Sequence, residues 1–236
     1  MESLEVPSWI GILAPALGIH VPPHLDHVFM AWVVMILLVL PCFLATRGLK
    51  PVPAPLQNAL EFLVETLRGF LETIIGPKGG QYLPLIGSLT LFILTCNLLG
   101  LVPGFKSPTS NLNTTVACAL VVFFSTHIIG IRRHGLFRYL KQFTGPIWWL
   151  APIMVPIELI GHLARPISLS VRLFGNIFGE DAVLLILLYL VPLLIPLPLM
   201  LLAIFTGVVQ TFVFVMLSMV YIARAEEADH GELVAP

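Results

Sequence analysis

Apolar runs long enough to cross a lipid bilayer recur along this chain. A membrane-spanning helix needs roughly 20 residues to cross about 30 Å of hydrocarbon, and three runs come near that length, at 28–45, 82–103 and 114–131. Hydrophobic residues make up 58% of the 236 residues and charged residues only 11%, and the mean hydropathy is +0.98. This composition lies outside the range of soluble globular proteins. We therefore predict an all-α integral membrane protein.

A further apolar segment, 147–190, is too long for one upright crossing. At 1.5 Å per residue it would form about 66 Å of helix, twice the thickness of the hydrocarbon core. It forms either one kinked, strongly tilted helix or two helices. Three prolines can kink or break it: Pro152, Pro156 and Pro166. We favour a hairpin of two long, tilted helices, the second at 193–223, which gives about five transmembrane helices in all.

The segment 55–75 has apolar and polar residues on opposite faces of a helix. The apolar residues recur at steps of three and four, and they are Leu56, Leu60, Leu63, Leu67, Phe70 and Ile74. The other face carries Gln57, Glu61, Glu65, Arg68 and Glu72. We predict an amphipathic helix that lies along the membrane surface. The chain has no internal repeat or low-complexity tract, so residues 1–236 are expected to form a single membrane domain.

Basic residues are distributed unequally between the expected loops. With the N-terminus outside, nine of the twelve Lys and Arg fall on the cytoplasmic side, Lys106 falls outside, and Arg165 and Arg172 fall within the membrane. This asymmetry predicts a cytoplasmic C-terminus. The net charge of −1 and the scattered basic residues give no sign of a nucleic acid partner.

One face of the segment 147–190 carries a stripe of polar residues. Its members are Glu158, His162, Arg165, Arg172, Asn176 and Glu180, and at 100° per residue they fall within roughly 80° of each other over about 33 Å. Ser168 flanks the stripe, and Asp181 lies one position off it. Thr206 and Gln210 provide a second polar line on the last helix. Two such lines facing each other predict a hydrated path through the membrane.

Arg172 is the most demanding residue of the stripe. Its nearest carboxylates along the helix, Glu180 and Asp181, lie two turns or more away, and a guanidinium does not lose its proton. A charge at this depth costs at least about 2.5 to 3.5 kcal/mol, so we expect its partner on another chain. The alternative, that buried charges simply pair with each other, applies better to Glu158, His162 and Arg165.

The remaining candidate groups give weaker signals. Cys42, Cys96 and Cys118 lie in apolar stretches and are interpreted as small buried hydrophobes. His127 is interpreted as a hydrogen-bonded packing residue, and Asn97 with Gly100 as helix-packing residues. The sequence contains no phosphate-binding glycine loop, nucleophile triad or zinc-ligand spacing. We therefore expect no metal, no cofactor and no covalent chemistry within this chain.

The stretch PISLSVRLFGNIFGED at 166–181, with VVQTFVFVMLSMVYIARA at 208–225 and CNLLGLVPGF at 96–105, resembles subunit a of the membrane sector of F-type ATP synthases. The resemblance runs over nearly the whole chain. It implies a bacterial plasma membrane protein that contacts a ring of c subunits and the b subunits of a peripheral stalk. It also implies that Arg172 faces the ring carboxylates and separates two aqueous half-channels for protons, which turn the ring and drive ATP synthesis.

The same resemblance implies roles for individual residues. Gln210 matches the polar partner of the arginine, and Ser168 matches a small polar position one turn before it. Asn176, Glu180 and Asp181 match the outer half-channel and Glu158 matches the inner one. His162 is assigned to the same proton path because it lies on the polar stripe one turn from Glu158. Some members of the family carry a His where this chain has Ala203, and some carry an Asp where it has Gly100. Either Glu180 or Asp181 could then relay protons.

Two other classes of function compete with this interpretation. A stand-alone ion channel or secondary transporter predicts inverted repeats with broken helices, and the sequence shows no such repeat. A purely structural bundle protein predicts that exchanging Arg172 changes only stability.

Overall fold

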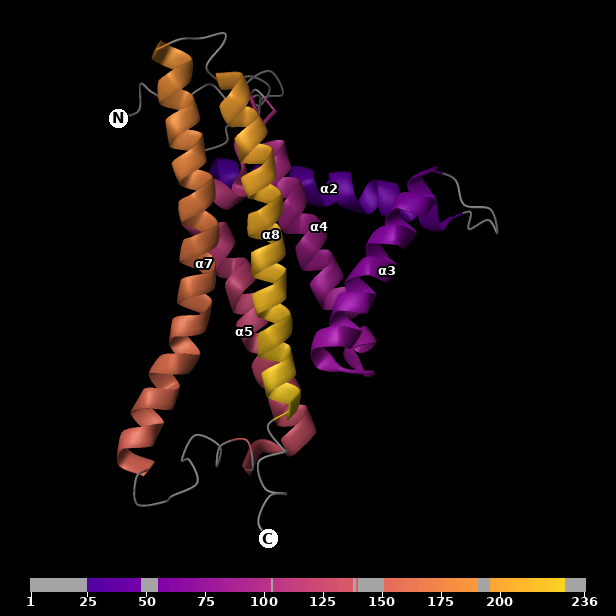
Figure 1. Ribbon diagram of the computed structural model, residues 1–236, viewed down its shortest axis with the longest axis vertical. Coiled ribbons are helices and arrows are strands. Elements are labelled where there is room, and N and C mark those ends of the chain that lie inside the picture. The colour runs from indigo at the N-terminus through magenta and orange to yellow at the C-terminus, as the bar shows by residue number, and fades with distance from the viewer. Residues whose placement is uncertain are drawn as a thin grey trace.

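The computed structural model describes residues 25–47, 55–102, 104–137, 139, 151–190 and 196–227. The regular elements in these ranges are all helices, as predicted (Figure 1). They are α2 (Asp26–Thr46), α3 (Pro55–Ile75), η3 (Gly79–Tyr82), α4 (Leu83–Leu99), η4 (Pro108–Ser110), α5 (Leu112–His134), α7 (Ala151–Leu190) and α8 (Pro196–Glu227). The organisation of 1–236 as one domain stays a prediction.

Four helical segments among the described residues are long and apolar enough to cross a membrane. They are Asp26–Thr46, Gly79–Leu99, Leu112–His134 and Leu197–Glu226. The prediction was about five, and α7 is the predicted membrane helix that is not among these four. The run predicted at 82–103 ends as a helix at Leu99, because the chain turns at Gly100. A Cβ at Gly100 would lie 2.6 Å from Cβ of Ser107, so glycine permits this close return of the chain. α5 begins earlier than predicted because the Asn111 side chain accepts a hydrogen bond from the backbone N–H of Asn113 at 2.9 Å.

Helix α7 is continuous over 40 residues, so the alternative of two separate helices is wrong for 151–190. It passes through Pro156 and Pro166, each of which removes one backbone hydrogen bond and favours a bend. Figure 1 shows the proline-containing end of α7 curving away from α8. α8 is 32 residues long and packs alongside α7, as the predicted hairpin requires; the connection at 191–195 lies outside the described residues.

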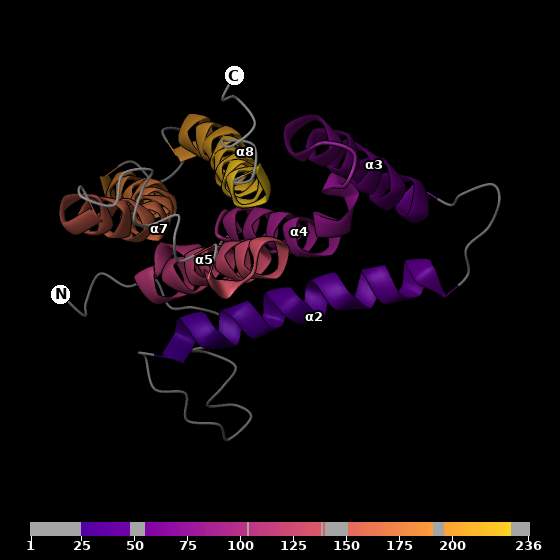
Figure 2. The ribbon, with the colours of Figure 1, turned by 90° about the horizontal axis from the view of Figure 1, so that it is seen from below.

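Helix α2 runs across the long direction of α7 and α8 (Figures 1 and 2). Only Met30 and Val34 of α2 are buried. Large side chains on its other faces are exposed, for example Trp32 at 60% and Ile36 at 61%. Such an apolar surface is suited to lipid. If α2 crosses the bilayer near its normal, α7 and α8 are strongly tilted, and this tilt lets about 60 Å of helix fit a bilayer half as thick.

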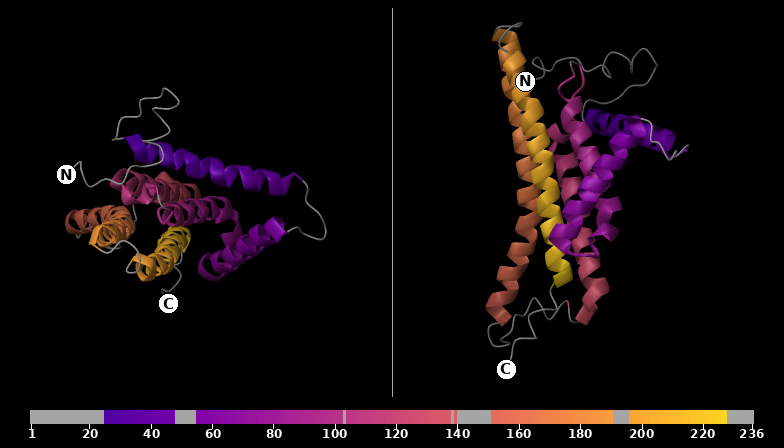
Figure 3. Two further views of the ribbon diagram at one scale, coloured as in Figure 1. Left: turned by 90° about the horizontal axis from the view of Figure 1, so that it is seen from above. Right: turned by 45° about the vertical axis from the view of Figure 1, so that its right-hand side comes forward.

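The interior is made of two apolar clusters on either side of α8. One joins α4, α5, α7 and α8 through residues that include Ile93, Leu173 and Phe214. The other joins α3, α4 and α8 and contains Leu67 and Leu71. The predicted amphipathic helix therefore forms at Pro55–Ile75, and it packs part of its apolar face on the bundle (Figure 3). Its acidic residues are exposed on the other face.

The end of α5 depends on a close contact at Gly130. A Cβ at this position would lie 2.5 Å from the ring of the buried Tyr139. Gly130→Ala should therefore destabilise the folded chain by about 1 to 3 kcal/mol through overpacking. The measurement is the thermal unfolding midpoint of the detergent-solubilised protein. Gly161→Ala is the matched control, because a Cβ at Gly161 meets nothing within 4 Å; equal midpoints for the two variants would contradict the expectation.

Candidate functional site

The outer face of α7 carries three polar residues at steps of four. Ser168, Arg172 and Asn176 are all exposed, and their apolar neighbours Ile167 and Val171 are 61% and 52% exposed. Helical spacing of four residues places the three side chains above one another on one face. Arg172 makes no hydrogen bond or ion pair with any described residue of the chain. A permanent cation is thus presented on an apolar surface.

Asn176 connects this outer face to α8. Its Nδ2 donates a hydrogen bond to Oε1 of Gln210 at 2.6 Å. Gln210 is only 5% exposed, so the bond links the rim of the exposed face to the interior. The predicted facing of the two polar lines is therefore observed at this pair.

A cavity of about 550 Å³ opens between α7 and α8 beside this hydrogen bond. Polar side chains from both helices line it, namely Asn176, Glu180, Thr206 and Gln210, together with apolar side chains such as Leu184, Leu199 and Phe205. Among the described residues of the lining, Glu180 is the one ionisable side chain, and it lies near Thr206, whose hydroxyl donates to the carbonyl oxygen of Leu202 at 3.1 Å. A polar cavity of this size has room for several water molecules.

Asp181 lies on a different side of α7 from its neighbour Glu180. Consecutive residues of a helix point about 100° apart, and the Asp181 side chain lies near Ser110 in η4, whose hydroxyl donates to the carbonyl oxygen of Ser107 at 2.8 Å. Asp181 does not line the cavity. The two candidate relay acids are therefore placed in distinct surroundings, one on the cavity and one on the connection between α4 and α5.

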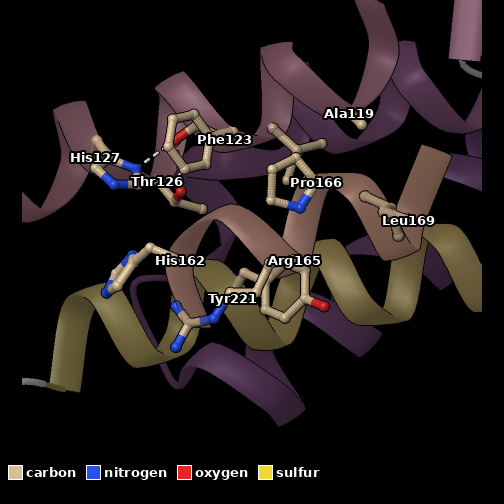
Figure 4. A pocket seen from close by; sticks show the side chains of 10 residues that line it. Ala119, Phe123, Thr126, His127, His162, Arg165, Pro166, Leu169 and Tyr221 are labelled. Carbon is tan, nitrogen blue, oxygen red and sulfur yellow. Dashed lines mark hydrogen bonds between the residues drawn. The ribbon is translucent and has the colours of Figure 1, made fainter. Parts of the chain in front are cut away.

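The other end of the polar stripe forms a second group, which we call the histidine cluster: Glu158, His162, His127, Arg165 and Tyr221. Glu158 Oε1 lies 3.4 Å from His162 Nε2. The ring of His162 meets the ring of His127 with centroids 5.2 Å apart, and Arg165 lies over the ring of Tyr221 at 5.6 Å. Figure 4 shows His127, His162, Arg165 and Tyr221 around a cavity of about 10 Å³, which holds one water molecule at most.

His127 is tied to its own helix within the histidine cluster. Its Nδ1 lies 2.8 Å from the carbonyl oxygen of Phe123, as expected for a hydrogen-bonded packing residue. Its ring also meets that of Tyr139 at 6.0 Å. Burial raises the pKa of the Tyr139 phenol, an effect opposed by nearby Arg165. For Glu158, His162 and Arg165, the alternative from the sequence was that they pair with each other. In the structure Glu158 pairs with His162, whereas Arg165 lies against the ring of Tyr221.

The structure thus groups the predicted residues in three places. Asn176, Glu180 and Gln210 share the large cavity, Glu158 and His162 share the histidine cluster, and Ser168 and Arg172 lie exposed between them. Ser110 was not predicted, because nothing in the sequence links this loop residue to an acid 71 positions later. Within the described ranges, no group of three or more His, Cys, Asp and Glu side chains is placed to hold a metal ion.

Comparisons with known proteins agree over most of the chain. The family model described as ATP synthase A chain matches residues 28–223. The chain is 53% identical over 205 residues to ATP synthase subunit a 2 of Syntrophotalea carbinolica, covering 87% of each protein. It is 50% identical to ATP synthase subunit a of Geobacter sulfurreducens, covering 87% of this chain and 89% of that protein. Its identity to ATP synthase subunit a of Syntrophobacter fumaroxidans is 51%, with coverage of 86% and 85%.

Proposed function

This chain belongs to the ATP synthase A chain family, and we propose that it is the stator of a rotary proton channel whose ring of c subunits faces Arg172. The observation that carries the proposal is the exposed Arg172 guanidinium on the outer face of α7, which has no partner among the described residues. Because an unpaired cation in lipid is costly, a carboxylate of a neighbouring subunit is the partner that it requires. The chain itself makes and breaks no covalent bond.

The two polar groups at either end of the stripe serve as the ends of two offset half-channels. The cavity at Glu180 forms the outer one, and the pair of Glu158 and His162 forms the inner one. Along α7 these ends are about 33 Å apart, with Arg172 about 12 Å from Glu180 and about 21 Å from Glu158 at 1.5 Å per residue. The component of this separation along the membrane normal lets protons enter and leave the ring at different depths in the membrane.

Arg172 prevents the two half-channels from acting as one leak. A guanidinium stays charged at all physiological pH values, so it repels an excess proton and favours an ionised carboxylate beside it. A ring carboxylate that reaches Arg172 releases its proton, and the carboxylate reloads only after further rotation. Each proton supplies about 2.3 kcal/mol per 100 mV to that rotation, which drives ATP synthesis in a separate catalytic head.

We also propose a membrane location and an orientation for the chain. The chain lies in the bacterial plasma membrane with its N-terminus outside and its C-terminus cytoplasmic, as the distribution of Lys and Arg favours. The b subunits of the peripheral stalk hold it against rotation, and H⁺ is the translocated ion. The exposed polar face of α3 and the basic end of α5 provide surfaces on which a stalk can dock.

Cross-linking tests the ring-facing surface directly. In the assembled complex, Ser168→Cys on α7 should form a disulfide with a cysteine placed near the ring carboxylate, because Ser168 is exposed one turn from Arg172. Ile36→Cys on α2 is the control, since Ile36 is also exposed, at 61%, and lies on another helix. Cross-linked product is measured by immunoblotting. Equal yields at the two positions, or none at Ser168, would reject the assignment of this face.

A further inference from the structure

Asn97 in α4 joins three separate elements through one buried side chain. It is 5% exposed, and its Nδ2 donates to the carbonyl oxygen of Gly207 and to Oγ1 of Thr211, both in α8 and both at 3.1 Å. Its Oδ1 accepts a hydrogen bond from Thr109 of η4 at 2.7 Å. Both ends of the amide are therefore satisfied, which fixes its orientation.

The η4 connection holds the amide from behind. The hydroxyl oxygens of Thr109 and Ser107 lie 2.7 Å apart, and Ser107 donates to the carbonyl oxygen of Cys96 at 2.9 Å. Because Thr109 occupies Oδ1, the Asn97 Nδ2 group can only face α8. A buried polar network whose members are all satisfied is rigid, and breaking one bond leaves a costly unpaired group.

Asn97 is hydrogen-bonded to the turn of α8 that carries Gln210. Gly207 lies three positions before Gln210 and Thr211 one position after it. Gly207 allows this approach, since a Cβ there would lie 3.3 Å from Cβ of Asn97. Successive residues of a helix lie about 100° apart around its axis. A rotation of α8 about its own axis by a fraction of that angle would therefore carry the Gln210 side chain away from Asn176.

The large cavity leaves room for such an anchor to matter. Between α7 and α8 about 550 Å³ is not filled by side chains, so packing against α7 contributes little to the rotation of α8 at Thr206 and Gln210. Across the cavity the helices meet through the polar contacts of Asn176 with Gln210 and of Glu180 with Thr206. The hydrogen bonds of Asn97 on the opposite side of α8 constrain the rotation of this helix.

We propose that Asn97 is a positioning residue for proton translocation, which acts by holding α8 in the rotation that brings Gln210 to Asn176. This inference rests on the proposed stator function. Asn97 itself carries no proton in this mechanism, because its amide is committed to Gly207, Thr211 and Thr109. Its contribution is geometric and depends on its two donated hydrogen bonds.

The test uses variants of the assembled complex with two readouts. Asn97→Asp keeps the acceptor for Thr109 and loses both donors to α8, Thr211→Val removes one hydroxyl at nearly constant volume, and Thr211→Ser is the matched control. The first readout is ATP-driven proton pumping. The second is cross-linking of cysteines placed at positions 176 and 210 by a short bifunctional thiol reagent, identified by peptide mass, in otherwise identical chains with the native cysteines retained.

We expect Asn97→Asp to lower both the cross-linking rate and the pumping rate at least about fivefold, with a smaller loss in Thr211→Val and none in Thr211→Ser. Wild-type cross-linking in Asn97→Asp overturns the inference, and so does wild-type pumping with a changed pH optimum, which would make residue 97 part of the proton path. If Asn97→Asp fails to assemble, Thr211→Val is the deciding variant. Wild-type rates of cross-linking and pumping in Thr211→Val would mean that Asn97 contributes to folding alone. Cross-linking needs no proton transport, so a failure of the stator function itself would appear in the Ser168→Cys experiment.

Discussion

Arg172→Ala is expected to abolish ATP-driven proton pumping while the complex still assembles. The guanidinium is exposed on α7 and makes no bond to described parts of its own chain, so its removal breaks no internal contact there. Under the proposed function, what is lost is the attraction that makes a ring carboxylate release its proton. Losing such a charge pair costs about 3 kcal/mol, and a barrier raised by that amount slows turnover about a hundredfold.

The measurement is acidification of inverted membrane vesicles upon ATP addition, with assembly checked by immunoblotting. Passive proton leak is measured after the catalytic head is stripped, and it should equal or exceed the wild-type leak because the electrostatic barrier is gone. Arg165→Ala is the matched control, since it removes the same side chain from the same helix, where Arg165 lies over Tyr221. Pumping by Arg172→Ala at near the wild-type rate would make this arginine an ordinary structural charge.

Helix positions and faces could be predicted from the sequence because they depend on local periodicity. The alternation of apolar and polar residues over 55–75 is a property of that segment alone, and α3 has these bounds. The stripe on α7 is similarly fixed by spacing, since a continuous helix places Arg172 and Asn176 on one face wherever the helix lies. Burial of Leu67 and Leu71 against other helices adds to this pattern without changing it.

Contacts between distant segments could not be predicted in the same way. The pattern of α2 says that it is apolar, and nothing in it specifies that α2 runs across α7 and α8 (Figure 1). Asp181 lies near Ser110, whose position depends on how η4 returns past Gly100. Periodicity determines which face of a helix is polar, whereas the element that meets this face depends on the packing of the whole bundle.

Glu180→Gln is expected to lower pumping at least about tenfold, and Asp181→Asn to lower it less. Glu180 is the ionisable side chain that lines the cavity beside Asn176 and Gln210, so its amide variant leaves the water there without a group that exchanges protons. A loss of about tenfold is at the low end of what positioned acid–base groups contribute. Asp181 instead lies near Ser110 and outside the cavity, and an amide there still accepts and donates hydrogen bonds.

The decisive comparison is vesicle acidification by the two variants over a range of pH, at equal amounts of assembled complex. Ala203 lines the same cavity as Glu180, so adding Ala203→His to Glu180→Gln returns a titratable group to that space and should restore part of the pumping. The same addition to Asp181→Asn should restore nothing, because Asp181 lies outside the cavity. If Asp181→Asn is the more damaging variant and Ala203→His rescues neither, protons reach Arg172 along η4, and the cavity between α7 and α8 is not their route.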